Sequence, residues 1–139
     1  MNNYMKLTFP SKAENEVFAR TCVSSFILPL NPSLSELSDV KTAVSEAITN
    51  AIVHAYPNDE NGEIRLEANI TDKTIHIKIK DDGVGISDLK VAREPFFTTK
   101  PESEHSGMGF TVMQTFMDKL DVVSDNSGTE IYMEKTITG

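Results

Sequence analysis

The chain has 139 residues, of which 39% are hydrophobic and 24% are charged, and its 13 basic and 21 acidic side chains give a net charge of −8. This length predicts one domain, covering residues 1–139, that buries roughly two-thirds of its surface. The acidic excess argues against a nucleic-acid partner, because binding phosphates requires a basic face. The N-terminus lacks the apolar core of a signal peptide, and no apolar run approaches the ~20 residues of a membrane span. We therefore expect a cytoplasmic protein with no membrane partner.

A strand and a helix are predicted first. Residues 4–9 alternate between apolar and polar side chains, as a strand does. Ser11 and Glu14 have the spacing of a capping box, which predicts a helix that begins there and ends before Pro29. The apolar residues 26–28 at the end of this helix fit either the core or a dimer interface, and their pattern does not decide between the two.

Cys22 and Arg20 are the two side chains of this first helix that suggest a specific chemical role. Cys22 is the only cysteine and lies among apolar positions, which favours a buried small side chain over a reactive thiol. Arg20 lies four residues after Glu16, so spacing alone favours an exposed salt bridge between them.

A second helix is predicted from Ser33 to about His54. Ser33 and Glu36 repeat the capping-box spacing. Three polar residues, Glu46, Asn50 and His54, follow one another at intervals of four and therefore share one edge of the helix. The buried stripe of this helix is expected to consist of Leu37, Val40, Val44, Ala47, Ile48 and Ala51.

The remaining elements predict a sheet with a third helix. Residues 62–70 and 74–80 alternate and form a hairpin. Residues 108–119 have helical periodicity, and residues 120–124 and 129–135 form a closing hairpin. The predicted fold is an α+β two-layer sandwich in which the helices cover one face of a mixed, largely antiparallel sheet.

A long connection between Asp81 and Phe110 is bracketed by two G-x-G pairs, Gly83 with Gly85 and Gly107 with Gly109. A loop of this length in a small domain is uncommon unless it is functional or disordered. Glycine allows close approach of the backbone to a ligand, and the second pair opens a helix whose N-terminus favours an anion. The pattern indicates a nucleotide site with a lid. Taken alone, however, D-D-G-V-G fits a plain hairpin turn, and neither a Walker loop nor a dinucleotide fingerprint is present.

The combination of four motifs is more specific. The sequences S-E-A-I-T-N-A-I-V-H, D-D-G-V-G-I, F-F-T-T-K-P and S-G-M-G-F resemble the nucleotide-binding boxes of the Bergerat-fold (GHKL) ATPases. These include type II topoisomerases, heat-shock 90 chaperones, MutL-type repair proteins and sensor histidine kinases. Over nearly its whole length the chain resembles the small anti-sigma serine kinases, and the sporulation anti-sigma-F factors more than the general-stress anti-sigma-B kinases.

The resemblance implies an ATP or ADP site with Mg²⁺. Asp81 would accept a hydrogen bond from the adenine amino group, and Thr129 would help to hold that carboxylate and the ring. Gly83 and Gly85 would let the backbone pass against the adenine. Asn50 would ligate Mg²⁺ through its amide oxygen and leave the other positions to phosphates and water.

The resemblance also assigns the catalytic and phosphate-binding side. Glu46 would be the general base that takes the proton from a serine hydroxyl. Lys100 could neutralise γ-phosphate charge or be a solvated loop lysine, and His54 could border the phosphates or only pack. His105 stands where relatives tend to carry arginine, which puts a phosphate or partner contact from this position in doubt. The remaining nucleotide contacts are assigned to the lid and the second glycine pair: Thr99, Ser106, Gly107, Met108, Gly109 and Phe110.

The function implied is that of an ATP-dependent protein serine kinase and anti-sigma factor. It would be a homodimer that sequesters a sigma-F-like sporulation sigma factor of RNA polymerase when ATP is bound, and phosphorylates an anti-anti-sigma protein on serine. Arg20 becomes a candidate partner contact in this light. Two alternatives stay open: a free-standing histidine-kinase catalytic module, and a non-catalytic nucleotide-gated binding protein in which Glu46 is structural.

Overall fold

A computed structural model describes residues 2–85 and 109–139. The strands are β1 (Asn2–Pro10), β2 (Glu63–Thr71), β3 (Thr74–Asp81), β4 (Lys119–Asp125) and β5 (Gly128–Thr136). The helices are α1 (Ala13–Ile27), α2 (Leu34–Asn50) and α4 (Gly109–Phe116), with a short 3₁₀ turn η1 (Leu28–Leu30) and a π-helical turn η2 (Ala51–Ala55).

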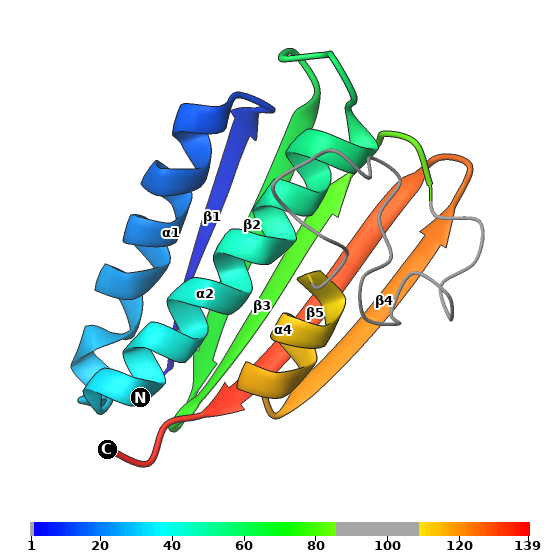
Figure 1. Cartoon of the computed structure of the whole chain (residues 1–139). Helices are drawn as coiled ribbons and strands as arrows, with labels where there is room; N and C mark the ends of the chain where they lie inside the picture. The colour runs from blue at the N-terminus through cyan, green and yellow to red at the C-terminus, as the bar shows by residue number, and fades with distance from the viewer. Residues whose placement is uncertain (1, 86–108) are drawn as a thin grey trace.

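The strands form one five-stranded sheet in the order β1-β2-β3-β5-β4, and the three helices lie on one of its faces (Figure 1). All four strand pairings of the described residues are antiparallel. The predicted α+β two-layer architecture is confirmed, and where the sequence left room for a mixed sheet, the described strands contain no parallel pair. Strands β1 and β4 are the two edges.

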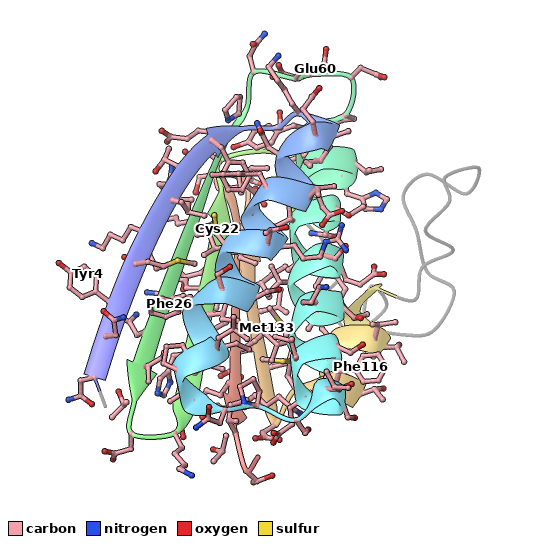
Figure 2. All side chains as sticks on the ribbon, turned by 90° about the vertical axis from the view of Figure 1, so that its left-hand side faces the viewer. Tyr4, Cys22, Phe26, Glu60, Phe116 and Met133 are labelled. Atoms are coloured by element: carbon pink, nitrogen blue, oxygen red, sulfur yellow. The ribbon has the colours of Figure 1, made fainter. Side chains whose placement is uncertain are left out.

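The core lies between the sheet and the helices and follows the alternation of the strands. The side chains that β2 and β3 turn toward the helices are buried, as predicted: Ile64, Leu66, Ala68, Ile70, Ile75, Ile77 and Ile79. From the helix layer, Val40, Val44, Ala47 and Ile48 of α2 are also fully buried. The opposite face of the sheet carries polar and charged side chains. Tyr4, 68% exposed, points away from the helices on that face (Figure 2).

The two predicted capping boxes differ in outcome. Ser33 and Glu36 form one at the start of α2, with the Glu36 amide donating to Ser33 Oγ and the Ser33 amide donating to Glu36 Oε1. The box predicted for Ser11 and Glu14 is wrong, because α1 begins at Ala13 and its N-cap, Lys12, makes no side-chain capping hydrogen bond. Ser11 is buried instead and holds the turn before β2.

Three hydrogen bonds explain the role of Ser11. Its hydroxyl donates to the Asp59 carbonyl (2.6 Å) and accepts from the Gly62 amide (3.0 Å), while its own amide donates to the Gly62 carbonyl (2.8 Å). A buried hydroxyl with these partners is fully satisfied, so it is not available to cap a helix.

At the end of α1, residues 26–28 differ in burial. Ile27 is buried in the core, Phe26 is half-buried, and Leu28 is 53% exposed. Cys22 is half-buried rather than fully buried. The third helix is shorter than predicted and ends at Phe116, since β4 already begins at Lys119. In residues 2–85 and 109–139, no helix is long and apolar enough to cross a membrane.

Candidate functional site

Asp81 is the centre of the candidate site. It is the last residue of β3, and its carboxylate is buried on the helix-covered side of the sheet. One oxygen, Oδ1, accepts hydrogen bonds from the amides of Gly83 (3.0 Å) and Thr129 (3.2 Å). No described residue donates to the other oxygen, Oδ2. Burial raises the pKa of Asp81, and the two amide hydrogen bonds oppose that rise. The site therefore presents one open acceptor that can read a hydrogen-bond donor of a ligand.

Thr129 lies directly opposite Asp81 on β5 and holds it through its backbone amide. The Thr129 hydroxyl is within 2.7 Å of Ser124 Oγ on β4, so its side chain pairs with Ser124 and not with the carboxylate. The preceding Gly128 has a φ of +142°, and a Cβ there would lie 2.0 Å from the Asp81 carbonyl oxygen. Only glycine lets β5 approach the end of β3 this closely.

The first glycine pair packs tightly against neighbouring backbone. A Cβ on Gly83 would lie 2.2 Å from the Ala55 carbonyl oxygen, and one on Gly85 would lie 1.8 Å from the Asp125 carbonyl oxygen. The Val84 amide donates to the Ala55 carbonyl at 2.8 Å. The segment after β3 is thus hydrogen-bonded to the end of η2 on one side and packs against the end of β4 on the other. This is a more specific arrangement than a plain hairpin turn.

The polar edge of the second helix is divided between two kinds of helix. Glu46 and Asn50 are half-buried and lie one turn apart on α2. His54 belongs to the π-helical turn η2, in which the Tyr56 amide donates to the Ala51 carbonyl five residues earlier (3.1 Å). The predicted continuous α-helix to His54 therefore ends at Asn50. π-helical turns occur frequently at functional sites.

Glu46 lies beside the start of α4. A Cβ built on Gly109 would lie 3.3 Å from Glu46 Oε2. Phe110, the next residue, is buried in the core, so its side chain serves packing. The structure thus brings a carboxylate of α2 to the N-terminus of the helix at which the sequence predicted phosphate binding.

Six lid residues of interest lie outside the described residues: Thr99, Lys100, His105, Ser106, Gly107 and Met108. The roles that the sequence gave them stay predictions.

Sequence reasoning missed Tyr56, which joins the start of β2 to the segment after β3. Its hydroxyl donates to the Glu63 carbonyl and accepts from the Asp82 amide, both at 2.7 Å. Its ring fills the space over Gly62, where a Cβ would lie 2.3 Å from the ring carbon Cγ. An aromatic residue directly after the polar helix edge was the available signal. Ser124 was also missed, although its register opposite Thr129 could be read from the closing hairpin.

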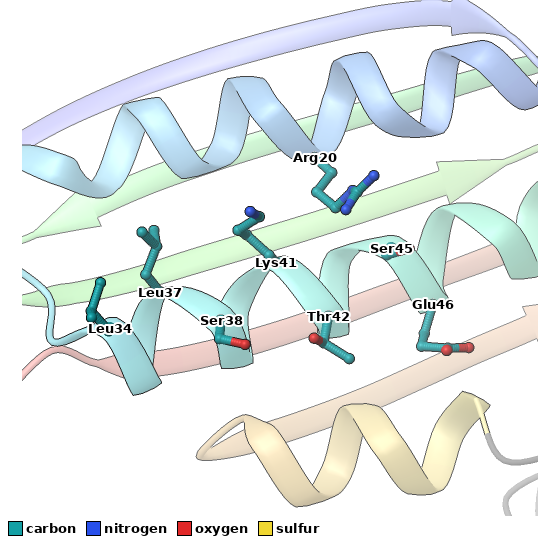
Figure 3. Close-up of a pocket in the computed structure, with 8 residues that line it drawn as sticks. All are labelled: Arg20, Leu34, Leu37, Ser38, Lys41, Thr42, Ser45 and Glu46. Atoms are coloured by element: carbon teal, nitrogen blue, oxygen red, sulfur yellow. The ribbon is translucent and has the colours of Figure 1, made fainter.

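Arg20 belongs to α1, whereas Asp81 is at the end of β3. Its Nε is 2.9 Å from Glu16 Oε2, as the spacing predicted, although both side chains are partly buried rather than exposed. Arg20 also lines a groove along α2 that extends from Leu34 to Glu46, and it lies between Lys41 and Ser45 (Figure 3).

The described site has the chemistry of nucleotide recognition. A buried carboxylate with one open oxygen suits a base amino group, and Glu46 lies where a helix N-terminus favours an anion. No group of three or more His, Cys, Asp or Glu side chains in the described part of the chain could hold a metal ion.

Comparison with known proteins identifies the family. The model of the histidine kinase-like ATPase domain matches residues 9–135. The chain is 56% identical over 136 residues to an anti-sigma F factor of Clostridium perfringens, covering 97% of both chains. It is 51% identical to an anti-sigma F factor of Geobacillus kaustophilus, covering 99% of this chain and 94% of that one.

Two solved structures share the fold. One contains the RsbU and RsbW domains of a Mycobacterium tuberculosis protein, at a TM-score of 0.70 and 14% identity. The match covers 97% of this chain but 32% of that longer one. The catalytic domain of the histidine kinase ThkA matches at a TM-score of 0.61 and 15% identity, over 98% and 97% of the two chains. The chain is a nucleotide-binding domain of the kinase-like ATPase type, and within these domains it belongs to the family of the anti-sigma F factors.

Proposed function

We propose that this protein is an anti-sigma factor and an ATP-dependent protein serine kinase of the cytoplasm. It binds a sporulation sigma factor and phosphorylates an anti-anti-sigma antagonist on serine. The relatives named anti-sigma F factor, at 56% and 51% identity over nearly the whole chain, support the partner class. The observation that carries the kinase activity is the position of the Glu46 carboxylate beside Gly109, at the N-terminus of α4.

The described residues fit an adenine nucleotide. The open oxygen of Asp81 can accept a hydrogen bond from the adenine amino group, while the amides of Gly83 and Thr129 hold the other oxygen. We propose that the backbone at Gly83 and Gly85 passes against the adenine. Asn50, on the same edge of α2 as Glu46, would hold Mg²⁺ through its amide oxygen. One protein ligand is sufficient for Mg²⁺ beside a nucleotide, because this ion keeps several waters and phosphate oxygens in its shell. When bound, the ion would neutralise part of the phosphate charge.

In the proposed transfer, Glu46 accepts the proton of the substrate serine hydroxyl. The serine oxygen forms a bond to the γ-phosphorus as the bond between that phosphorus and the β,γ-bridging oxygen breaks, giving phosphoserine and ADP. The N-terminus of α4 would stabilise the negative charge on the phosphates. Lys100 in the lid is proposed to do the same.

We propose that the nucleotide selects the partner. The ATP form binds the sigma factor, and the ADP form holds the antagonist until phosphorylation releases it. A ligand can shift such an equilibrium only by its difference in affinity for the two states.

We also propose a homodimer. An apolar groove between α1 and the edge strand β1, of about 430 Å³, supports this because it is lined by Met5, Phe18, Cys22 and Phe26 together with Thr21 and Ser25. Phe18 is 57% exposed, and exposed apolar patches of this kind mark interaction surfaces.

The test of the kinase activity is Glu46→Gln. We expect this variant to bind Mg-ATP and the sigma factor as the wild type does, and to lose phosphorylation of the antagonist by a factor of about 10² or more, because general-base catalysis contributes about that much. Equal phosphorylation by the two proteins would show that Glu46 is structural, as in a non-catalytic nucleotide-gated binding protein. Phosphorylation of histidine instead of serine would favour the histidine-kinase alternative.

A further inference from the structure

The groove along α2 contains basic side chains that have no role in the proposed phosphate transfer. It has a volume of about 420 Å³ and is lined by one residue of α1 and seven of α2: Arg20, Leu34, Leu37, Ser38, Lys41, Thr42, Ser45 and Glu46. Figure 3 shows Arg20 reaching from α1 toward α2, with Lys41 beside it and Glu46 on the side that faces α4. The groove therefore runs from the start of α2 to the proposed catalytic base.

The two cations of the groove differ in their partners. The charge of Arg20 is met by Glu16 at 2.9 Å. Lys41 has no carboxylate within ion-pair distance among the described residues. The side chains one turn away on the same helix are all uncharged: Leu37, Ser38, Val44 and Ser45. Within residues 2–85 and 109–139, Lys41 is thus a half-buried cation without an ionic partner, in a chain whose net charge is −8.

The far end of the groove is apolar. Leu34, in the first turn of α2, is 87% exposed, and Leu37 follows it one turn later. An exposed leucine, an unpaired lysine and a carboxylate thus follow one another along a single helix. At a rise of about 1.5 Å per residue, Lys41 lies ~10 Å from Leu34 and ~7.5 Å from Glu46 along the axis.

We propose that this groove binds the phosphoacceptor protein, and that Lys41 pairs with an acidic side chain of that protein close to its phosphorylated serine. The inference rests on the proposed function, because it is Glu46 that identifies this end of the groove with the acceptor hydroxyl. The sigma factor is a less suitable occupant, because its binding involves no phosphate transfer and therefore requires no hydroxyl beside Glu46. Because Lys41 and Glu46 point to different sides of α2 (Figure 3), the pairing requires a carboxylate on the acceptor protein within roughly 15 Å of the serine. Leu34 offers contact for an apolar side chain farther away.

The experiment compares Lys41→Glu with Lys73→Glu. Lys73 is exposed in the turn between β2 and β3 and makes the same change of charge outside the groove. We expect Lys41→Glu to raise the KM for the phosphoacceptor protein about tenfold at low salt, as loss of a complementary charge pair does, with kcat and Mg-ATP affinity within about twofold of the wild type. The Lys73→Glu variant should match the wild type. The effect of Lys41→Glu should shrink as the salt concentration rises.

A charge swap makes the test specific. Acidic residues of the phosphoacceptor protein within roughly 15 Å of its serine are changed to lysine one at a time. One of these changes should restore a low KM with Lys41→Glu while raising the KM with the wild type. Equal KM values for Lys41→Glu and Lys73→Glu would overturn the proposal. So would a loss of sigma-factor binding by Lys41→Glu with an unchanged KM.

A binding measurement tests the groove separately from the proposed kinase activity. If the wild type transfers no phosphate, the groove is tested by calorimetric binding of the same protein in the presence of ADP. Weaker binding by Lys41→Glu than by Lys73→Glu would support the groove without the kinase reaction. Equal binding would refute the docking site itself.

Discussion

Asp81 shows how a single residue can be costly for folding and necessary for binding. A buried carboxylate loses its hydration, and burial raises its pKa. An acid whose pKa is raised in the folded state makes the fold less stable as the pH rises through and above the ordinary value of 3.8. The ionised Asp81 therefore lowers the stability of the fold. This cost is expected for a carboxylate that is kept buried and charged in order to bind a ligand.

The change Asp81→Asn should separate the two effects. Asparagine keeps an oxygen that can accept from the amides of Gly83 and Thr129, and it carries no charge, so we expect the thermal midpoint at pH 7 to equal or exceed that of the wild type. Nucleotide binding should be lost, because the open acceptor can be replaced by an NH₂ donor. Calorimetry with Mg-ATP measures the binding.

The neighbouring Asp82→Asn is the control. Asp82 is exposed and pairs with Arg65 through two hydrogen bonds of 2.8 and 2.9 Å, so its loss should cost about 1 kcal/mol or less and leave nucleotide binding intact. Binding of Mg-ATP by Asp81→Asn at wild-type affinity would contradict the assignment of the site to Asp81.

The sequence pointed to individual residues of the candidate site but not to the contacts that hold them in the structure. The family motifs pointed to Asp81 and Thr129, but not to the hydroxyl pair of Thr129 and Ser124 or to the hydrogen bonds of Tyr56. These contacts join residues from different elements. They depend on strand register and on where a helix ends, and neither is contained in a local pattern.

At the level of elements, the two capping-box patterns show the same limit. Ser11 and Ser33 both precede a glutamate by three residues, yet only Ser33 caps a helix. The difference is tertiary, because the turn before β2 takes the hydroxyl of Ser11. By contrast, the alternation of β2 and β3 was predicted correctly, since each strand has one face turned to the core and one to solvent.

The cap of α2 also anchors the C-terminal end of the chain. The Glu36 carboxylate accepts from the amides of Ser33, Thr138 and Gly139 and from the Thr138 hydroxyl. These hydrogen bonds, led by the one from the Thr138 amide, lower the pKa of Glu36 from 4.5 to about 2. A lowered pKa gives stability that is fully present above 4.5 and is lost as the pH falls toward about 2.

The change Glu36→Gln should therefore destabilise the protein in a pH-dependent way. Above pH 4.5 we expect a lower free energy of unfolding than in the wild type, and the difference should shrink between pH 4.5 and about 2. Chemical denaturation at several pH values measures this difference. Glu60→Gln, the same substitution at an exposed position in the turn before β2, is the control. A constant difference for Glu36→Gln across this range would mean that the charge of Glu36 does not act through these hydrogen bonds.

On the scale of the whole molecule, residues 2–85 and 109–139 form one layer of helices on one layer of sheet, and no element among them covers the two sheet edges or the polar sheet face. At the β1 edge, unpaired backbone groups lie beside the apolar groove of α1, whereas β4 carries the exposed Val123 at the other edge. Exposed strand edges readily pair with other chains unless they are protected. The combination of an open edge and an apolar groove makes the α1–β1 side the most suitable surface for the proposed homodimer.

The change Phe18→Glu tests this surface. A charge in the middle of an apolar interface of ordinary size, about 800 Å² per partner, should convert a dimer to a monomer at micromolar concentration, because the charge would have to be desolvated. Sedimentation equilibrium measures the mass, and circular dichroism shows that the variant is folded, as we expect for a side chain that is 57% exposed. Val123→Glu, the same change at the opposite sheet edge, should remain dimeric. A dimeric Phe18→Glu would assign the interface to another surface. A monomeric wild type would refute the homodimer. Neither result would change the contacts around Asp81 and Glu46, which lie within a single chain.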